Sequence, residues 1–302
     1  MSIDLTAPGV KGVLGSAYRT QRIGLASESA TFGMMMMAEM KSRLWIPGLL
    51  CASLAWAQPA NQTGIAHLAF RVTDLEAARG FYSRLGFQQF FEMKQRERTT
   101  EAFLKINDRQ FIELYPRTDP AQPLGLMHVC YESSDLEALH AEYVHRGLTV
   151  SDVKKAGAGN LLMTMQDPRG QTIEYTQYMP GSRHFEDRGQ HLGANRVSQM
   201  LIGATVAAGD VAATRAFYVD KLGFTEFARG VPSRLRMPGD SGQELDIVAA
   251  GAEVKSGLQF GVFDLKKTAE TLVGLGLRPT SASMSIAVDD PDGVAIRFVK
   301  VN

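Results

Sequence analysis

The stretch that decides the fold is GIAHLAFRVTDLEAARGFYSRLG at residues 64–86, because residues 201–223 repeat its pattern as LIGATVAAGDVAATRAFYVDKLG. Each copy has a short apolar run, then an aspartate (Asp74 or Asp210), then an Ala-rich segment with a Phe-Tyr pair before a Leu-Gly turn. Aspartate caps helix N-termini and glycine follows helix ends, so each copy predicts a strand followed by a helix. An internal repeat of this length indicates two homologous domains.

The repeat extends to the end of each copy. DPRGQTIE at residues 167–174 matches DPDGVAIR at residues 290–297. We therefore predict domains at residues 62–180 and 198–302, joined by a polar linker at residues 181–197. A chain of 302 residues with 45% hydrophobic residues is long and apolar enough for two cored domains.

Each domain divides again into two halves with the same pattern. In the first domain, the first half is expected to contain a strand at 65–72, a helix at 75–85 and strands at 87–93, 101–106 and 110–115. The second half is expected to contain a strand at 126–131, a helix at 136–146, and strands near Val150, at 161–165 and at 172–178. The prediction is an α+β fold made of four β-α-β-β-β units.

The segment before the first domain has the features of an export signal. Lys41 and Arg43 precede an apolar stretch at 44–54, and Ala55-Trp56-Ala57 has the pattern of a cleavage site. We expect residues 40–57 to be a signal peptide cleaved near Ala57, giving a periplasmic or secreted protein with no membrane segment in its mature form. Residues 1–39 are expected to be a non-native or disordered extension, produced by a start codon placed too far upstream.

Charge and cysteine content exclude several classes of protein. Lys plus Arg equals 32 and Asp plus Glu equals 32, so the basic excess typical of a nucleic-acid partner is absent. The two cysteines, Cys51 and Cys130, exclude a disulfide scaffold and a Cys-rich zinc module. Cys51 lies within the expected signal peptide, and Cys130 is interpreted mainly as a buried structural residue.

Four residues of the first domain carry the candidate chemistry. His67 and His128 lie in the opening strands of the two halves, and Glu113 and Glu174 lie in their otherwise apolar last strands. Both His-to-Glu separations are 46 residues, so the pairs occupy equivalent places. A buried carboxylate costs several kcal/mol unless it is paired or bound to a metal. Two imidazoles and two carboxylates that converge favour a divalent transition ion.

Strand alternation predicts which residues share the face of these side chains. With a period of two, Ile65 and Ala69 point to the same side as His67, and Cys130 points to the same side as His128. Two linker histidines, His184 and His191, are interpreted as ordinary linker residues, with approach to the cleft as proton donors the minor alternative.

These features together resemble the vicinal oxygen chelate (VOC) superfamily. The likeness rests on the paired β-α-β-β-β units, on Phe81-Tyr82 before Leu85-Gly86-Phe87, and on the motif of residues 167–170 before Ile173-Glu174. This superfamily includes glyoxalase I, extradiol dioxygenases, methylmalonyl-CoA epimerase and the fosfomycin and bleomycin resistance proteins. The resemblance covers both domains and is specific for the superfamily, not for one activity.

The resemblance implies a metal site. The family's ligands come from the first and last strands of each unit, which correspond to His67, Glu113, His128 and Glu174 and imply one divalent ion (Ni, Co, Zn, Mn or Fe). This quartet resembles bacterial glyoxalase I. It implies a lyase or isomerase that acts on a small oxygen-chelating substrate through an enediolate, with Glu174 or Glu113 shuttling the proton. Sites of the superfamily form within one chain or across two, so a homodimer stays open.

Two other functions stay open. An Fe(II) extradiol-type dioxygenase would use only the triad His67, His128 and Glu174. A metal-free small-molecule binding protein, similar to the bleomycin resistance proteins, would leave the quartet unexplained.

The second domain departs from the ligand pattern. Gly203 aligns with His67 and Arg297 aligns with Glu174, while Asp246 falls near the Glu113 position and Gln259 near the His128 position. We therefore expect a degenerate domain without metal ligands, which buttresses the first domain or closes over its pocket.

Overall fold

The structure, a computed structural model, describes residue 59 and residues 61–230, 232–251 and 255–302. The expected extension at 1–39 and the expected signal peptide at 40–57 lie outside the described residues. Among the described helices, none has both the length and the apolar character needed to cross a membrane.

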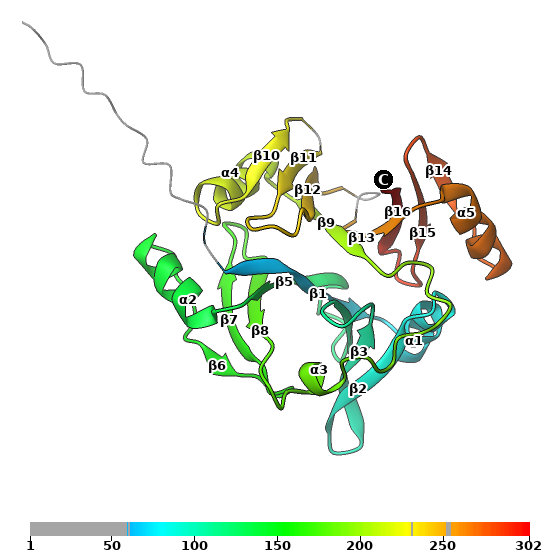
Figure 1. The fold of residues 1–302 in the computed structure, drawn as a ribbon, viewed down its shortest axis with the longest axis horizontal. Helices are drawn as coiled ribbons and strands as arrows, with labels where there is room; N and C mark the ends of the chain where they lie inside the picture. The colour runs from blue at the N-terminus through cyan, green and yellow to red at the C-terminus, as the bar shows by residue number, and fades with distance from the viewer. Residues whose placement is uncertain (1–58, 60, 231, 252–254) are drawn as a thin grey trace, which may run out of the picture. The chain divides into compact units, whose positions relative to one another are not determined.

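The first domain is built around one eight-stranded sheet in the order β2-β3-β4-β1-β5-β8-β7-β6. Its strands are β1 (Gln62–Val72), β2 (Gln88–Gln95), β3 (Arg98–Lys105), β4 (Phe111–Pro116), β5 (Gly125–Ser133), β6 (Lys154–Lys155), β7 (Leu161–Gln166) and β8 (Thr172–Gln177). The opening strands β1 and β5 pair antiparallel at the centre, and each pairs in parallel with the last strand of its own unit, β4 or β8. The four strands that carry the predicted site are therefore the four central strands of the sheet, which is curled in Figure 1.

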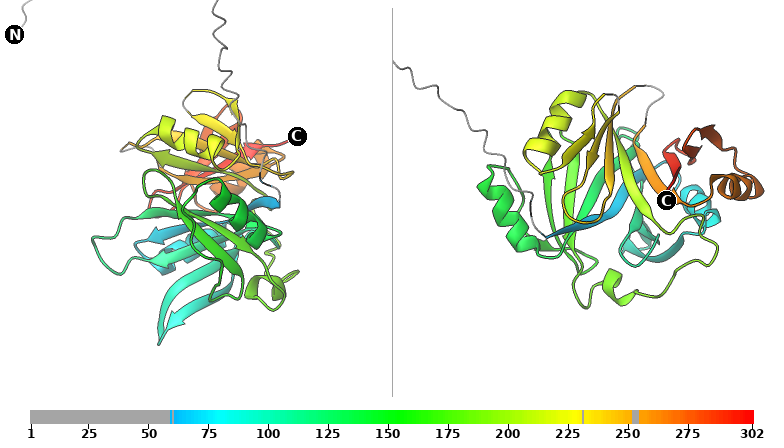
Figure 2. Two further views of the ribbon diagram at one scale, coloured as in Figure 1. Left: turned by 90° about the vertical axis from the view of Figure 1, so that its left-hand side faces the viewer. Right: turned by 45° about the horizontal axis from the view of Figure 1, so that its top comes forward.

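The second domain repeats this topology as β10-β11-β12-β9-β13-β16-β15-β14. Its strands are β9 (Leu201–Ala208), β10 (Thr225–Ala228), β11 (Ser233–Arg236), β12 (Glu244–Ala249), β13 (Gly257–Val262), β14 (Thr280–Ala282), β15 (Ser285–Asp289) and β16 (Ala295–Lys300). The turned views in Figure 2 show the two sheets as separate curled layers. The predicted α+β fold of four β-α-β-β-β units is confirmed.

One helix belongs to each unit. These helices are α1 (Leu75–Arg84), α2 (Leu136–His145), α4 (Val211–Asp220) and α5 (Leu265–Gly274). Each begins after an aspartate whose side chain accepts hydrogen bonds from backbone N–H groups of the first turn, namely Asp74, Asp135, Asp210 and Asp264. These bonds satisfy donors that have no partner within the helix, which explains why the cap recurs in all four units.

Two predicted segments differ from the structure. The strand expected near Val150 is instead the two-residue strand β6 at Lys154–Lys155, while Val150 packs against the core outside any strand. The linker range 181–197 contains a further short helix, α3 (Arg183–Glu186). In Figure 1 this helix lies across the curled first sheet from β1 and β5.

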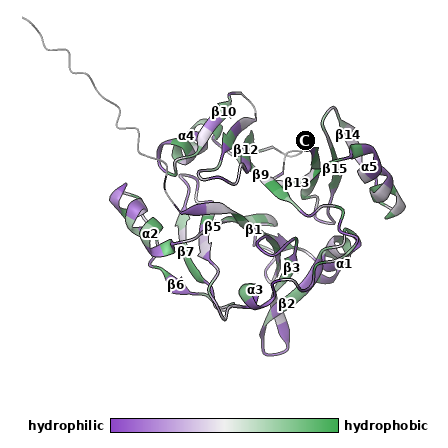
Figure 3. Ribbon diagram, in the orientation of Figure 1, coloured by the Kyte–Doolittle hydropathy of each residue, from purple (hydrophilic) through white to green (hydrophobic). Residues whose placement is uncertain are grey.

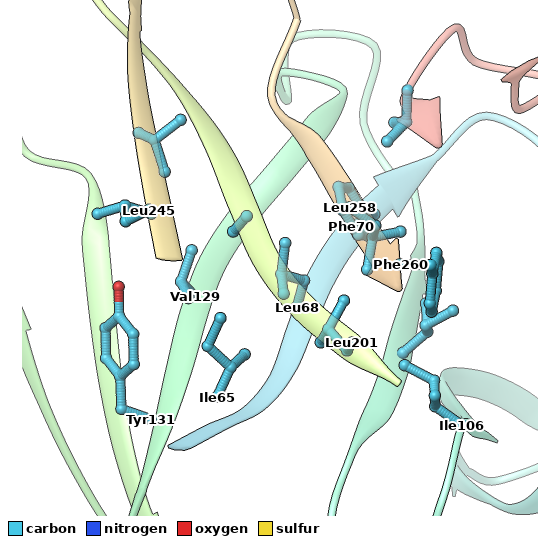
Figure 4. Close-up of a cluster of buried hydrophobic side chains, with 14 of the residues drawn as sticks. Ile65, Leu68, Phe70, Ile106, Val129, Tyr131, Leu201, Leu245, Leu258 and Phe260 are labelled. Carbon is cyan, nitrogen blue, oxygen red and sulfur yellow. The ribbon is translucent and has the colours of Figure 1, made fainter. Parts of the chain in front are cut away.

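A continuous apolar core joins the two domains. Figure 4 shows side chains from β1, β5, β9, β12 and β13 meeting in it, among them Ile65, Leu68, Phe70, Val129, Tyr131, Leu201, Leu245, Leu258 and Phe260. The rings of Phe87 and Phe260 stack across it with centroids 5.1 Å apart. Strands β9 and β13 are largely apolar in Figure 3, whereas the tip of the β2–β3 hairpin is hydrophilic. Burial of these apolar faces stabilises the contact between the two domains.

One buried glutamine ties the two domains through their backbones. The Gln110 side chain donates to the carbonyls of Ile65 (3.2 Å) and Leu201 (2.9 Å) and accepts from the Leu201 N–H (3.0 Å). Gln110 directly precedes β4, so this contact fixes the start of the strand that carries Glu113.

Candidate metal centre

A bulge in β1 decides which side chains face the site. Ile65 pairs with Tyr131 and His67 pairs with Cys130, so Ala66 is an extra residue. The bulge reverses the alternation, and Ile65 points into the core between the domains. The prediction that Ile65 shares the face of His67 is therefore wrong, because strict alternation assumes a strand without bulges.

Three predicted ligands converge beyond this bulge. The Nε2 atoms of His67 and His128 lie 3.0 Å apart, and His67 Nε2 lies 3.4 Å from Glu174 Oε1. One ligand atom from each of these residues falls within 4.8 Å of the other two. Both histidines are buried and Glu174 is nearly so, although the three residues come from three different strands. The structure thus brings together the two-histidine, one-carboxylate set.

Glu113 joins this group from the side. Its Oε1 lies 3.2 Å from His67 Nδ1 without the geometry of a hydrogen bond, and its Oε2 lies 3.8 Å from His128 Nε2. The Tyr115 hydroxyl donates to Glu113 Oε2 over 3.2 Å. Glu113 therefore lies beside the triad, close to both histidines.

The electrostatics of the group favour a bound cation. Burial raises the pKa of Glu113 well above its usual range, and the charges of Glu101 and Glu174 raise it further. Burial also raises the pKa of Glu101. For Glu174, burial opposes ionisation, yet the hydrogen bond and charge of His67 and the charge of His128 lower its pKa to about 2. Burial lowers the pKa of His128 to about 4.

These groups fit a divalent ion. Across the described residues, the three carboxylates form no ion pair with lysine or arginine, so three clustered acids lack a permanent counter-charge. Imidazole nitrogen and carboxylate oxygen are ligands that nickel, cobalt, zinc, manganese and iron accept. The donor set therefore matches the ion that the sequence predicts.

The group forms one side of a cavity of about 410 Å³. His67, Glu113 and Glu174 line it, together with residues outside the predicted set: Glu101, Tyr115, Lys154, Lys155, Asn160 and residues 156–158. His184 from the linker also lines it, whereas His191 pairs with Asp187 over 2.5 Å instead. The minor alternative for His184, approach to the cleft, is thus the arrangement observed.

Two of the missed residues form a hydrogen-bonded unit with Glu113. The Tyr115 hydroxyl lies within hydrogen-bond distance of both Glu101 and Glu113, and its single proton serves one carboxylate at a time or is shared between them. Tyr115 lies two residues after Glu113 in β4, so strand alternation puts both side chains on one face. The sequence therefore contained a signal for Tyr115. Glu101 carried no such signal, because its position depends on the pairing of β3 with β4.

Cys130 is fully buried, as its structural interpretation predicts. It packs with Ala66, Phe111 and Tyr178 and pairs across β5 and β8 with Glu174. Burial raises the pKa of its thiol well above the usual range, so the thiol stays protonated.

Strand pairing corrects one equivalence in the second domain. Gln259 pairs with Gly203 as Cys130 pairs with His67, so Gln259 corresponds to Cys130. The residue at the His128 position is Gly257, two positions earlier than expected. The equivalence predicted from the sequence was wrong because β13 contains no histidine that could be matched to His128.

The remaining positions of the second domain hold an ion-pair cluster. Arg297 stands where Glu174 stands in the first domain, and its Nη1 lies 3.7 Å from the buried Asp246. Arg234 Nε also pairs with Asp246, at 3.2 Å. Among the described residues, the first-domain triad is the one group of three acidic, histidine or cysteine ligands that converges.

Comparison with known proteins agrees with the fold. Residues 64–175 match the model of the Glyoxalase/Bleomycin resistance protein/Dioxygenase superfamily. The first domain therefore belongs to this superfamily, the VOC superfamily that the sequence motifs indicated. No curated protein matches the chain.

Solved structures show the same fold over both domains. The Mn(II)-bound glyoxalase from Novosphingobium aromaticivorans is 14% identical and aligns with a TM-score of 0.62 over 80% of this chain and 82% of its own. A catechol 2,3-dioxygenase is 15% identical and aligns with a TM-score of 0.63 over 80% of this chain and 89% of its own. The homoprotocatechuate 2,3-dioxygenase from Arthrobacter globiformis is 18% identical and aligns with a TM-score of 0.58 over 82% of each chain. At these identities the likeness establishes the fold alone.

Proposed function

We propose that this protein is a metal-dependent VOC enzyme that acts on a small substrate chelating through two oxygens. The observation that carries the proposal is the convergence of His67, His128 and Glu174 beside a cavity that His67 and Glu174 line. Three protein ligands leave positions of the ion open for substrate oxygens. The superfamily match and the metal-bound glyoxalase among the similar structures support it.

The reaction we propose is proton transfer of the glyoxalase type, catalysed by an isomerase or lyase. A bound divalent ion would supply Lewis-acid polarisation of the substrate oxygens. Glu113 contacts both histidines, lies outside the triad and lines the cavity. Its carboxylate is placed to accept a proton from a carbon next to the chelating oxygens and to return it to the neighbouring carbon. Tyr115 holds Glu113 for this role, and Glu174 stays a ligand.

A second candidate is an extradiol-type dioxygenase. The same triad favours it, provided that Glu113 is not a metal ligand. Two histidines and one carboxylate are the ligand set of non-haem Fe(II) oxygenases. Such an enzyme consumes O₂ with a catechol, whereas the isomerase consumes none. The metal-free binding protein is the least supported alternative, since it leaves clustered buried carboxylates without a counter-charge.

The deciding experiment is metal analysis of the purified protein after reconstitution with each of Ni, Co, Zn, Mn and Fe(II). We expect about one ion per chain in the wild type, and its loss in a His67→Ala/Glu174→Ala double variant. His140→Ala, which changes a histidine on helix α2 outside the cavity, is the matched control and keeps the ion. A wild-type protein that binds none of these ions overturns both enzymatic candidates.

Glu113→Gln then separates the two reactions. The proton-transfer candidate requires that this variant keeps its metal but loses solvent deuterium incorporation into α-hydroxyketone substrates. Oxygen uptake with catechols by the iron-loaded wild type would instead establish the dioxygenase.

We also propose that the protein is exported through the signal at residues 40–57. Export would place the enzyme away from glutathione, which is chiefly cytosolic, so its substrate is not expected to be a glutathione adduct. N-terminal sequencing of the native protein tests the proposal: a start near residue 58 supports it, and a peptide from residues 1–36 contradicts it.

A further inference from the structure

A histidine from the linker lies inside the cavity of the first domain. His184, on α3, is 3% exposed and lines the cavity together with Asn160. Its imidazole is surrounded by the rings of Phe90, Phe91, Phe103, Phe111 and Tyr178. The Tyr178 ring stacks on it with a centroid distance of 5.0 Å. The imidazole is therefore held in one orientation.

The side chains of His184 and Asn160 bond to each other but leave one polar atom each without a partner. Asn160 Nδ2 lies 2.8 Å from His184 Nδ1. The other polar atoms, His184 Nε2 and Asn160 Oδ1, are buried without a hydrogen-bond partner. An unsatisfied buried polar group is costly, so a pair of them at a cavity wall indicates that something else completes the bonds.

The position of α3 is fixed by a buried lysine. Lys105 on β3 places its Nζ 2.8 Å from Asp187 Oδ2, at the C-terminal cap of α3, and 2.9 Å from Asp108 Oδ1. It also donates to the Asp187 carbonyl. Because Lys105 is fully buried, this clamp fastens the linker to the sheet and holds His184 at the cavity.

The chemistry of the pair selects its ligand. Burial lowers the pKa of His184 to about 3, so the ring is neutral at physiological pH and has one donor and one acceptor nitrogen. If the Asn160 amide donates to Nδ1, then Nε2–H and Asn160 Oδ1 remain for a ligand. If the amide is turned round, Nε2 accepts and the Asn160 NH₂ donates. Either arrangement offers one donor and one acceptor, which an uncharged hydroxyl group matches.

We propose that His184 and Asn160 form a hydroxyl-binding subsite in the cavity of the metal site. The inference rests on the proposed function and deepens it: the substrate carries an uncharged hydroxyl in addition to its two chelating oxygens. The linker between the domains thereby contributes to substrate selection.

The test uses pairs of chelators that differ by one hydroxyl. Acetohydroxamic acid is compared with 2-hydroxyacetohydroxamic acid, and catechol with pyrogallol, by calorimetric titration of the zinc-loaded protein. We expect at least one hydroxylated probe to bind about 3- to 10-fold more tightly than its partner, the effect of one net hydrogen bond. Two pairs present the hydroxyl at two positions relative to the chelating oxygens.

Two variants assign the preference to His184. His184→Asn keeps an amide near the Nδ1 position, facing Asn160, but removes Nε2. His184→Gln reaches the Nε2 position. We expect the preference to vanish in His184→Asn and to persist in His184→Gln, with zinc content and affinity for the plain chelators unchanged in both.

The outcomes separate the two proposals. Zinc binding with no preference for either hydroxylated probe in the wild type, or a preference that His184→Asn leaves intact, overturns the subsite and leaves the proposed function standing. Failure of the wild type to bind any metal overturns both. If His184→Asn does not fold, the ¹⁵N resonances of His184 in the wild type are measured instead. The subsite requires a larger shift of these resonances with the hydroxylated probe than with its plain partner. Equal shifts overturn it.

Discussion

The two domains share a backbone plan but not its chemistry. Both have the same strand order, both cap their helices with aspartate, and both carry a one-residue bulge at the same place in the opening strand. The first domain puts His67, His128 and Glu174 at positions where the second has Gly203, Gly257 and Arg297. Glu113 and Asp246 occupy a fourth equivalent position. The fold therefore supplies four such positions, and the residues at them decide whether a metal can bind.

The two domains also balance buried charge differently. In the second, the buried Asp246 pairs with Arg234 and Arg297, so the cluster carries its own counter-charges. In the first, the carboxylates contact histidines and a tyrosine instead. Arginine supplies the positive charge that a buried carboxylate needs, so Asp246 does not require a metal ion for charge compensation.

The largest expected effect comes from giving the first domain the arginine of the second. Glu174→Arg removes a ligand and places a cation beside Glu113, so divalent metal affinity should fall by more than about 100-fold, since even outer partners of ligands cost about 10- to 100-fold. Equilibrium dialysis with zinc measures this. The reverse change, Arg297→Glu, should create no site, because Gly203 and Gly257 offer no ligand. Zinc binding to the Glu174→Arg protein at wild-type affinity would show that the triad is not the site.

The largest expected effect on stability concerns the core that joins the domains. Phe260→Ala removes a buried ring that stacks on Phe87, and we expect it to lower the free energy of unfolding by about 3–5 kcal/mol. Phe263→Ala, three residues away, removes a ring that is 69% exposed and should change stability by less than about 0.5 kcal/mol. Chemical denaturation of both variants checks the contrast, and equal losses would contradict it.

The pH dependence of stability should report the buried linker histidine. The pKa of His184 is lowered to about 3 in the folded state, so its stabilising contribution is present above its unfolded pKa of about 6.5 and is lost as pH falls toward 3. Between pH 6.5 and pH 5 the free energy of unfolding should fall by about 2 kcal/mol through this group. Urea titrations of the wild type and His184→Asn should show a shallower loss in the variant. Parallel curves would mean that His184 does not stay neutral in the folded protein.

The smallest expected effect compares equivalent helix caps. Asp74→Ala and Asp210→Ala each remove side-chain hydrogen bonds to the first turn of their helix, and each should cost about 1 kcal/mol. Thermal unfolding of the two variants measures this. A loss confined to one variant would show that the repeated cap is not equivalent in the two domains.

Local patterns in the sequence determined much of this protein. The repeated strand-helix stretch predicted two domains, the aspartates predicted the helix starts, and the equal spacing of His67–Glu113 and His128–Glu174 predicted four side chains that meet. These inferences succeed because caps and strand faces depend on residues close to one another in the chain.

The tertiary structure alone decided the rest. The bulge at Ala66 turns Ile65 away from the site, Glu113 lies beside the triad, and Gly257 holds the place expected for Gln259. Most of all, His184 reaches the cavity because a buried lysine from a distant strand clamps the linker. Each of these facts depends on pairing or packing between segments far apart in sequence, where small shifts in register decide which atoms touch.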